Sequence, residues 1–218
     1  MKKYIIISLL MAICFGAAAQ EKIYSVKSGI ITMEMDMMGQ AVVQEIYFDD
    51  YGAKKATVMN MRGQKTRNIV VDGKTVMVND EEKTAMTMPS MGPGGPGGGP
   101  GFGPGAGMGS DINFLNLDEK TIKKNKIKEL GEEEIIGLPC KKYSYRVMMM
   151  GGAMTTYVWV YKGITLKTSM KTDFGEMGMA ATKLQEDVEI DPAMFVVPEG
   201  VTIQEMRRPA GPPQGFDF

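Results

Sequence analysis

Apolar and polar residues alternate along most of the chain with a period of two, which is typical of strands that bury one face. In the first such segment Met33, Met35 and Met37 occupy one face, whereas Glu34 and Asp36 occupy the other. Turn residues rich in Gly and Asp separate the segments, and a strand meander follows from that spacing. The pattern predicts strands over residues 24–37, 41–49, 55–61, 66–71, 75–79, 83–88, 127–136, 140–150, 155–161, 166–173 and 179–189, followed by a last extended segment over 201–206.

A Gly/Pro-rich stretch divides these strands into two groups. Residues 89–109 contain 11 Gly and 5 Pro, without a collagen repeat or a phosphate-binding motif. Such a stretch has little to bury and loses much backbone entropy on ordering, so we expect a disordered loop. The next residues, 111–124, are the one plausible helical insertion, capped by Asp111 or Asp118.

These elements predict one mainly β domain with a minor α component. About eleven strands and one or two short helices form it, and an antiparallel sheet of that length must curl or split. One face is then packed or lines a cavity, and the other meets water. The expected organisation is a first meander over 20–88, the loop over 89–109, a helical insertion with a second meander over 110–206, and a flexible tail over 207–218.

The first residues have the pattern of a secretory signal peptide. Lys2 and Lys3 precede an apolar run over residues 5–15, and three alanines ending at Ala19 follow. An apolar run of about a dozen residues is too short to span a bilayer. We therefore expect cleavage between Ala19 and Gln20 and export to the periplasm.

The composition of the mature chain argues against several classes of function. Without residues 1–19, the remaining 199 residues carry 23 basic and 26 acidic side chains, which does not favour nucleic-acid binding. Histidine is absent, so the commonest general base and the commonest zinc ligand are missing. The sequence therefore predicts a protein that is not an enzyme and holds no cofactor. Cys140 is the single remaining cysteine, and we expect it to be buried on a strand.

Methionine is unusually abundant, with 20 residues in the mature chain. Three interpretations remain open. The thioethers fill the core; they form an adaptable lining for a lipid or another apolar ligand; or Met33, Met35 and Met37 bind copper(I) as soft ligands on one strand face.

Aromatic residues form a second stripe. Tyr157, Trp159 and Tyr161 share one face of a strand, with Tyr143 and Tyr145 nearby in the sequence. Such stripes usually pack within the sheet, and on a curved sheet they can also form the floor of a ligand groove. Prolines in the C-terminal tail and the lack of a lipid-facing apolar band argue against a membrane-spanning barrel.

Several motifs together resemble one family. They are the exported N-terminus, Gly131-Glu132-Glu133, Ile136-Gly137-Leu138-Pro139-Cys140, Val158-Trp159-Val160, Lys162-Gly163-Ile164 and Phe195-Val196-Val197-Pro198-Glu199-Gly200. The chain resembles the LolA/LolB-like superfamily of envelope proteins, over nearly all of its mature length. The resemblance implies an unclosed β-barrel whose concave side is capped by short helices and, in the carrier members, holds acyl chains of lipoproteins.

The leading hypothesis is a periplasmic binding or carrier module for a lipid or lipidated protein. The predicted ligand-binding residues are Met33, Met35, Met37, Phe48, Met59, Met61, Tyr143, Tyr145, Tyr157, Trp159 and Tyr161. The alternatives are a copper(I)-handling protein that uses Met33, Met35 and Met37, and a structural or interaction protein of the envelope.

Overall fold

A computed structural model describes residues 21–37, 40–61, 64–71, 74–88, 112–149, 152–172 and 175–205. The predicted signal peptide with its Ala19–Gln20 cleavage site, the loop over 89–109 and the tail over 207–218 lie outside these residues. The strands are β1 (Gly29–Met37), β2 (Gln40–Asp49), β3 (Lys54–Met61), β4 (Gln64–Val71), β5 (Lys74–Asn79), β6 (Thr84–Met88), β7 (Lys128–Ile135), β8 (Leu138–Met149), β9 (Gly152–Tyr161), β10 (Ile164–Thr172), β11 (Gly175–Glu186) and β12 (Thr202–Glu205). The helical elements are α1 (Glu119–Asn125) and the short 3-10 turns η1 (Asp50–Gly52) and η2 (Pro192–Phe195).

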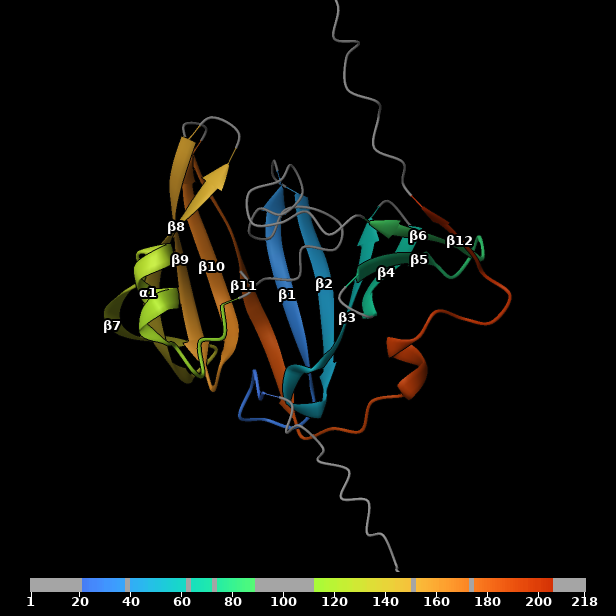
Figure 1. Cartoon of the computed structure of the whole chain (residues 1–218), viewed down its shortest axis with the longest axis horizontal. Coiled ribbons are helices and arrows are strands. Elements are labelled where there is room, and N and C mark those ends of the chain that lie inside the picture. The colour runs from blue at the N-terminus through green and yellow to red at the C-terminus, as the bar shows by residue number, and fades with distance from the viewer. Residues whose placement is uncertain are drawn as a thin grey trace, which may run out of the picture.

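All twelve strands belong to one sheet in the order β12-β6-β5-β4-β3-β2-β1-β11-β10-β9-β8-β7 (Figure 1). The two predicted meanders are joined where β1 pairs with β11, from Gly29 opposite Glu186 to Met35 opposite Met179. The sheet ends at β7 and β12 and does not close into a barrel. The predicted fold class, a curved and mainly β sheet with short helices, is confirmed.

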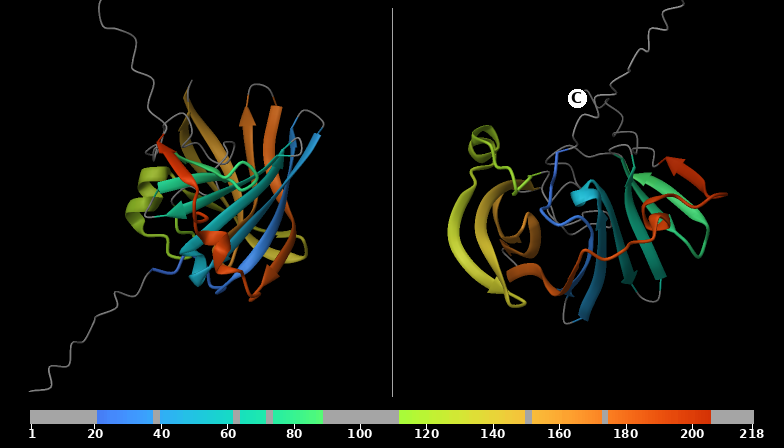
Figure 2. Two further views of the ribbon diagram at one scale, coloured as in Figure 1. Left: turned by 90° about the vertical axis from the view of Figure 1, so that its right-hand side faces the viewer. Right: turned by 90° about the horizontal axis from the view of Figure 1, so that it is seen from below.

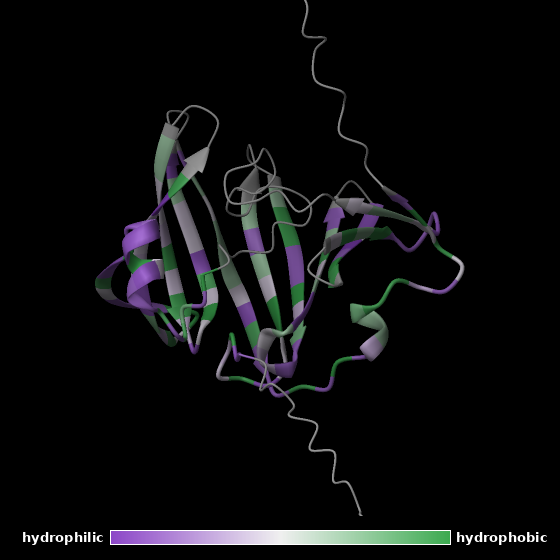
Figure 3. Cartoon of the chain, in the orientation of Figure 1, coloured by the Kyte–Doolittle hydropathy of each residue, from purple (hydrophilic) through white to green (hydrophobic). Residues whose placement is uncertain are grey.

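The sheet curls so that its two ends come forward on the same side (Figure 2). Helix α1 and residues 112–118 lie on this concave side, in front of β8 and β9. Phe114 packs there against Tyr143 and Tyr145, with ring centroids 5.3 and 6.2 Å apart. Apolar and polar segments alternate along the strands, as the period-two pattern requires (Figure 3).

Helix α1 begins where the sequence provides a cap. The Asp118 side chain accepts a hydrogen bond of 2.6 Å from the Thr121 amide, which satisfies a free donor of the first turn. This interaction lowers the pKa of Asp118. Of the two predicted caps Asp118 is the one used, and Asp111 lies outside the described residues.

Three details of the predicted strands are wrong. The strand predicted over 179–189 spans Gly175–Glu186. The first strand begins at Gly29 and not at Tyr24, because the Tyr24 and Ser25 amides donate to the Tyr51 and Lys162 carbonyls and not to a strand neighbour. The last strand, β12, runs parallel to β6, so the sheet is not wholly antiparallel. The intervening chain crosses from β11 to the far edge and can therefore reach β6 in this direction.

The convex face of β3–β6 is covered by η2 and the chain that follows it. Ala56, Ile69, Val76, Val78 and Ala85 form this apolar cluster, with Tyr47, Phe195, Val197 and Val201 packed against it. Arg67 holds η2 and the following residue against the sheet. Its buried guanidinium donates hydrogen bonds to the carbonyls of Ala193, Met194 and Val196 at 2.7, 2.9 and 3.1 Å. Its remaining nitrogens pair with Asp80.

We predict that Arg67→Ala lowers the free energy of unfolding by roughly 3 kcal/mol, because several charge-assisted hydrogen bonds are lost at a buried site. Urea unfolding followed by circular dichroism measures this change. Lys65→Ala, at an exposed position of the same strand, is the control and should stay within about 0.5 kcal/mol of the wild type. Equal effects of the two substitutions would show that Arg67 does not anchor η2.

Candidate functional site

Methionines gather on the concave face of the sheet. Residues that pair directly across strands point to the same face, and the row Tyr143–Val158–Thr168–Met179–Met35 runs from the Phe114 contact to β1. Of the ten methionines whose side chains the structure describes, nine lie on this face; the tenth is Met194 in η2. The nine are Met33, Met35, Met59, Met77, Met86, Met154, Met170, Met177 and Met179.

The centre of this methionine face is closely packed. Met33 is fully buried, and Met35 and Met179, which pair across β1 and β11, are nearly so. Gln44 lies among them, and its side-chain amide donates to the Met179 sulfur at 3.3 Å. The β1–β11 junction is therefore the floor of the concave face.

The walls on either side are more accessible. Met59, Met77 and Met86 on β3, β5 and β6 are half-buried, as is Met154 on β9. Met177 on β11 is 40% exposed. Buried thioethers thus form the floor, and partly exposed thioethers flank it.

Aromatic residues complete the wall at β8. Tyr143 and Tyr145 are buried beneath Phe114, Ile112 and Leu117. Burial, followed by the nearby Glu129 carboxylate, raises the pKa of Tyr143, so its phenol is neutral at ordinary pH. On β8 the concave face is therefore covered by the side chains of Ile112, Phe114 and Leu117.

The second predicted stripe lies on the opposite face. Tyr143 pairs with Val158 and not with Tyr157, so Tyr157, Trp159 and Tyr161 point away from Tyr143 and Tyr145. The structure does not bring these two aromatic groups together. The hairpin register decides this, since a shift of one residue would move a whole strand's side chains to the other face.

Trp159 is only 5% exposed and belongs to a buried cluster that also contains Cys140, Ile164 and Leu166. Lys142 and Lys167, its cross-strand neighbours, place their ammonium groups 4.7 and 4.6 Å from the indole centroid. The Glu133 carboxylate accepts hydrogen bonds from Trp159 Nε1 and from Lys142 Nζ. The Lys142 hydrogen bond, and then the Trp159 one, holds the pKa of Glu133 below its usual range. Trp159 is therefore occupied by its neighbours.

The other predicted site residues divide in the same way. Phe48, fully buried, lies on the concave face opposite Gly29, with Met33, Met35 and Met59. Met37 and Met61 end β1 and β3, and their side chains lie outside the described part of the chain. The sequence analysis did not include Met77, Met86, Met154, Met170, Met177 and Met179 in the site. The alternation of side chains along each strand indicates that they belong to this face, but only once the pairing between strands is known.

The side chains on this face that could bind a metal ion are mainly methionine thioethers, which are soft ligands. Within the described ranges, no group of three His, Cys, Asp or Glu side chains is placed to hold a metal ion. Cys140 is fully buried on β8, as expected; burial raises the pKa of its thiol, and Sγ lies 3.4 Å from the Leu138 carbonyl.

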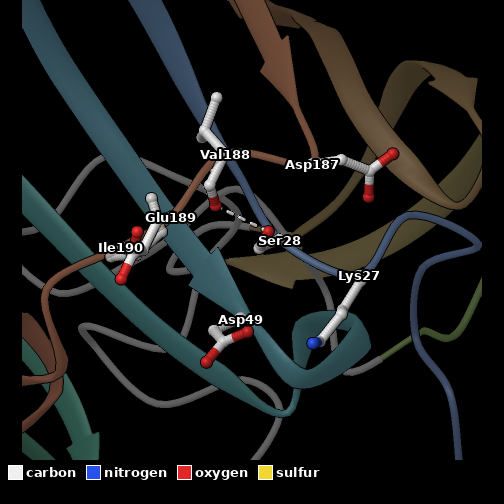
Figure 4. A pocket seen from close by; sticks show the side chains of 7 residues that line it. All are labelled: Lys27, Ser28, Asp49, Asp187, Val188, Glu189 and Ile190. Carbon is white, nitrogen blue, oxygen red and sulfur yellow. Dashed lines mark hydrogen bonds between the residues drawn. The ribbon is translucent and has the colours of Figure 1, made fainter.

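A polar pocket of about 350 Å³ lies where the chain before β1, the end of β2 and the chain after β11 meet (Figure 4). Its lining residues are Lys27, Ser28, Asp49, Asp187, Val188, Glu189 and Ile190. The Ser28 hydroxyl donates to the Val188 carbonyl at 2.7 Å and joins the chain before β1 to the chain after β11. We interpret this pocket as part of the sheet junction.

Comparisons with known proteins support the fold. No protein-family model and no curated protein matches the sequence. Among solved structures, an uncharacterised conserved protein from Thermus thermophilus is similar, with a TM-score of 0.52 at 8% identity over 84% of this chain and 92% of that one. At 8% identity this similarity is evidence for the fold alone.

Two further structures are more distant. A chain of the MucA/MucB complex of Pseudomonas aeruginosa has a TM-score of 0.48 at 14% identity, over 78% of this chain. This chain spans 55% of that chain's length.

A putative outer membrane lipoprotein-sorting protein domain from Vibrio parahaemolyticus has a TM-score of 0.38 at 14% identity, over 78% of this chain and 89% of that one. Among the residues described here, no helix has the length and hydrophobicity to cross a bilayer.

Because Trp159 is the only tryptophan, its fluorescence reports on the Glu133 contact. The pKa of Glu133 is lowered in the folded protein, so its contribution to stability is present above the unfolded pKa and is lost as the pH falls through the folded one. We predict that Trp159 emission stays constant down to about pH 4.3, the ordinary glutamate pKa, and changes only below it. Glu133→Gln should remove this acid transition, whereas a transition at higher pH would contradict the assignment.

Proposed function

We propose that the concave face binds the acyl chains of a lipid or a lipidated protein, and that the protein is a periplasmic, non-enzymatic binding or carrier module. The observation that carries this proposal is the gathering of nine methionines on one face of a curved sheet. Thioether side chains are unbranched, flexible and polarisable, so a surface made of them can repack around chains of different shape.

The distribution of burial supports a binding surface over a core alone. A closed core would bury all its methionines, but Met59, Met77, Met86 and Met154 keep part of their surface and Met177 is 40% exposed. Sites for small apolar ligands are concave and mostly apolar, with few polar groups, and the methionine face has that character.

A copper(I)-handling role is the second candidate. Met35 and Met179 pair directly across β1 and β11, and Met33 follows on the same face. Thioethers are soft ligands that suit copper(I). Met179 already accepts a hydrogen bond from Gln44, and a metal at that sulfur would have to displace it. The third hypothesis, a structural or interaction protein, rests on the loop over 89–109, which lies outside the described residues.

A charge on the wall tests the lipid proposal. We predict that Met59→Lys weakens binding of a fluorescent long-chain fatty acid to the delipidated protein by about tenfold or more, because the ammonium must be desolvated against the acyl chain. Val43→Lys is the matched control, since Val43 is 45% exposed on the opposite face of the neighbouring strand. Absence of binding by the wild type, or equal losses in both variants, would contradict the proposal.

Replacing methionine by leucine distinguishes an acyl-chain ligand from copper(I). In the triple variant Met33→Leu, Met35→Leu and Met179→Leu, the apolar surface is kept and the thioethers are removed. We predict that fatty-acid affinity changes by less than about threefold, because the burial of the chain is unchanged. Titration with copper(I) against a competing chelator gives the second result: strong binding by the wild type that the triple variant abolishes would favour the copper candidate.

A further inference from the structure

One polar side chain on the methionine face has no partner. Asn68 on β4 pairs with Thr57 and Met77, and therefore points to the concave face. Its residue is 4% exposed. Among the residues that the structure describes, neither Nδ2 nor Oδ1 of Asn68 has a hydrogen-bond partner.

Such a group is unusual in a folded protein. Most buried polar side-chain atoms are hydrogen-bonded, because an unpaired one has lost its water without compensation. A carboxamide loses more than a hydroxyl, since it has two N–H donors and an oxygen with two lone pairs. Both functions of Asn68 are unpaired.

Gln44 shows what a locally satisfied amide looks like on the same face. It is about as buried as Asn68, at 6% exposure, and it donates to the Met179 sulfur. The lack of a partner is therefore specific to Asn68 and is not a general property of amides on this face.

The other wall has a second unpartnered group. Thr156 on β9 pairs with Tyr145 and Met170, which places it on the concave face as well. It is 1% exposed, and its Oγ1 has no hydrogen-bond partner in the described part of the chain. Two unpaired buried polar groups on the methionine face point to a ligand that is not purely hydrocarbon.

We propose that the ligand of the concave face is an amide-linked acyl compound whose amide group pairs with Asn68; this inference rests on the proposed function. A secondary amide has an N–H donor that can pair with Oδ1 of Asn68. Because its carbonyl lies on the opposite side of the trans amide, a second acceptor of the same compound has to pair with Nδ2. An ester of the same chain has only acceptors and leaves Oδ1 unpaired, and an alkane leaves both atoms unpaired. The Thr156 hydroxyl supplies a contact for a second polar atom of such a compound.

Three probes that differ in one group test the inference on the full mature protein. They are a hexadecanoyl N-alkyl amide, the ester with the same chains and the corresponding alkane, each competed against a fluorescent fatty acid. We expect the amide to bind about tenfold more tightly than the ester, because a site built for a hydrogen-bond donor discriminates against a ligand that lacks it. Equal binding of the three probes would overturn the inference and leave the proposed function intact. Failure of all three to bind would overturn both.

Asn68→Leu, which keeps the branched shape of the side chain and removes both hydrogen-bonding functions, gives an independent readout. In this variant the amide and the ester should bind equally, and the empty protein should melt at a higher temperature than the empty wild type, since an unpaired buried amide has been removed. Asn60→Leu, at an exposed asparagine on β3, should change neither result. A lower melting temperature in Asn68→Leu would overturn the inference, because the carboxamide would then have a partner within the folded chain. If the variant does not fold, the ranking of the probes on the wild type still decides.

Discussion

The structure depends on the pairing of β1 with β11. These strands lie about 150 residues apart in the sequence, since Gly29 pairs with Glu186 and Met35 with Met179. Closing so long a loop is entropically unfavourable, and burial of apolar side chains along the junction has to compensate for it. Gly29 permits the close approach: a Cβ there would lie 2.5 Å from both the Gln185 carbonyl oxygen and the Phe48 ring.

This single junction determines the two surfaces of the sheet. The row from Tyr143 through Met179 to Met35 forms the concave face, and the row from Lys142 through Trp159 and Lys167 forms the convex one. Long side chains occur on both, but with different chemistry. On the concave face they are thioethers, buried at the centre and partly exposed on the walls. On the convex face they are lysines whose ammonium groups lie near the Trp159 ring, one of them paired with Glu133.

The concave face therefore combines adaptability with selective polarity. In the proposed function the methionines accommodate chains of various shapes, whereas Asn68 and Thr156 are polar groups at fixed positions on β4 and β9. Affinity for an acyl chain and discrimination between polar linkages would thus come from different residues. The carboxamide without a partner reduces the stability of the empty protein, as is often the case where a side chain is kept for a ligand.

Much of the architecture follows from local sequence. The period-two pattern predicts the strands, and the residues flanking them predict the hairpins, because both depend on neighbours in the chain. The Asp118 cap and the burial of Cys140 are local in the same sense. Within one strand, alternation also shows that Met33 and Met35 share a face, so part of the candidate site is readable without a structure.

The sequence by itself determined which side chains of one strand share a face. Only the tertiary structure decided which face of each strand joins which face of its neighbours. Because Tyr143 pairs with Val158, Trp159 lies on the opposite face. The irregularity between Thr32 and Met33 shifts the pairing with β11 by one residue, so that Leu184 and Ala181 both lie on the face of the apolar β1 residues. Neither shift has a local signature, because a register is the outcome of packing whole faces against each other. The parallel β12 and the Arg67 anchor of η2 likewise arise from contacts between segments far apart in the chain.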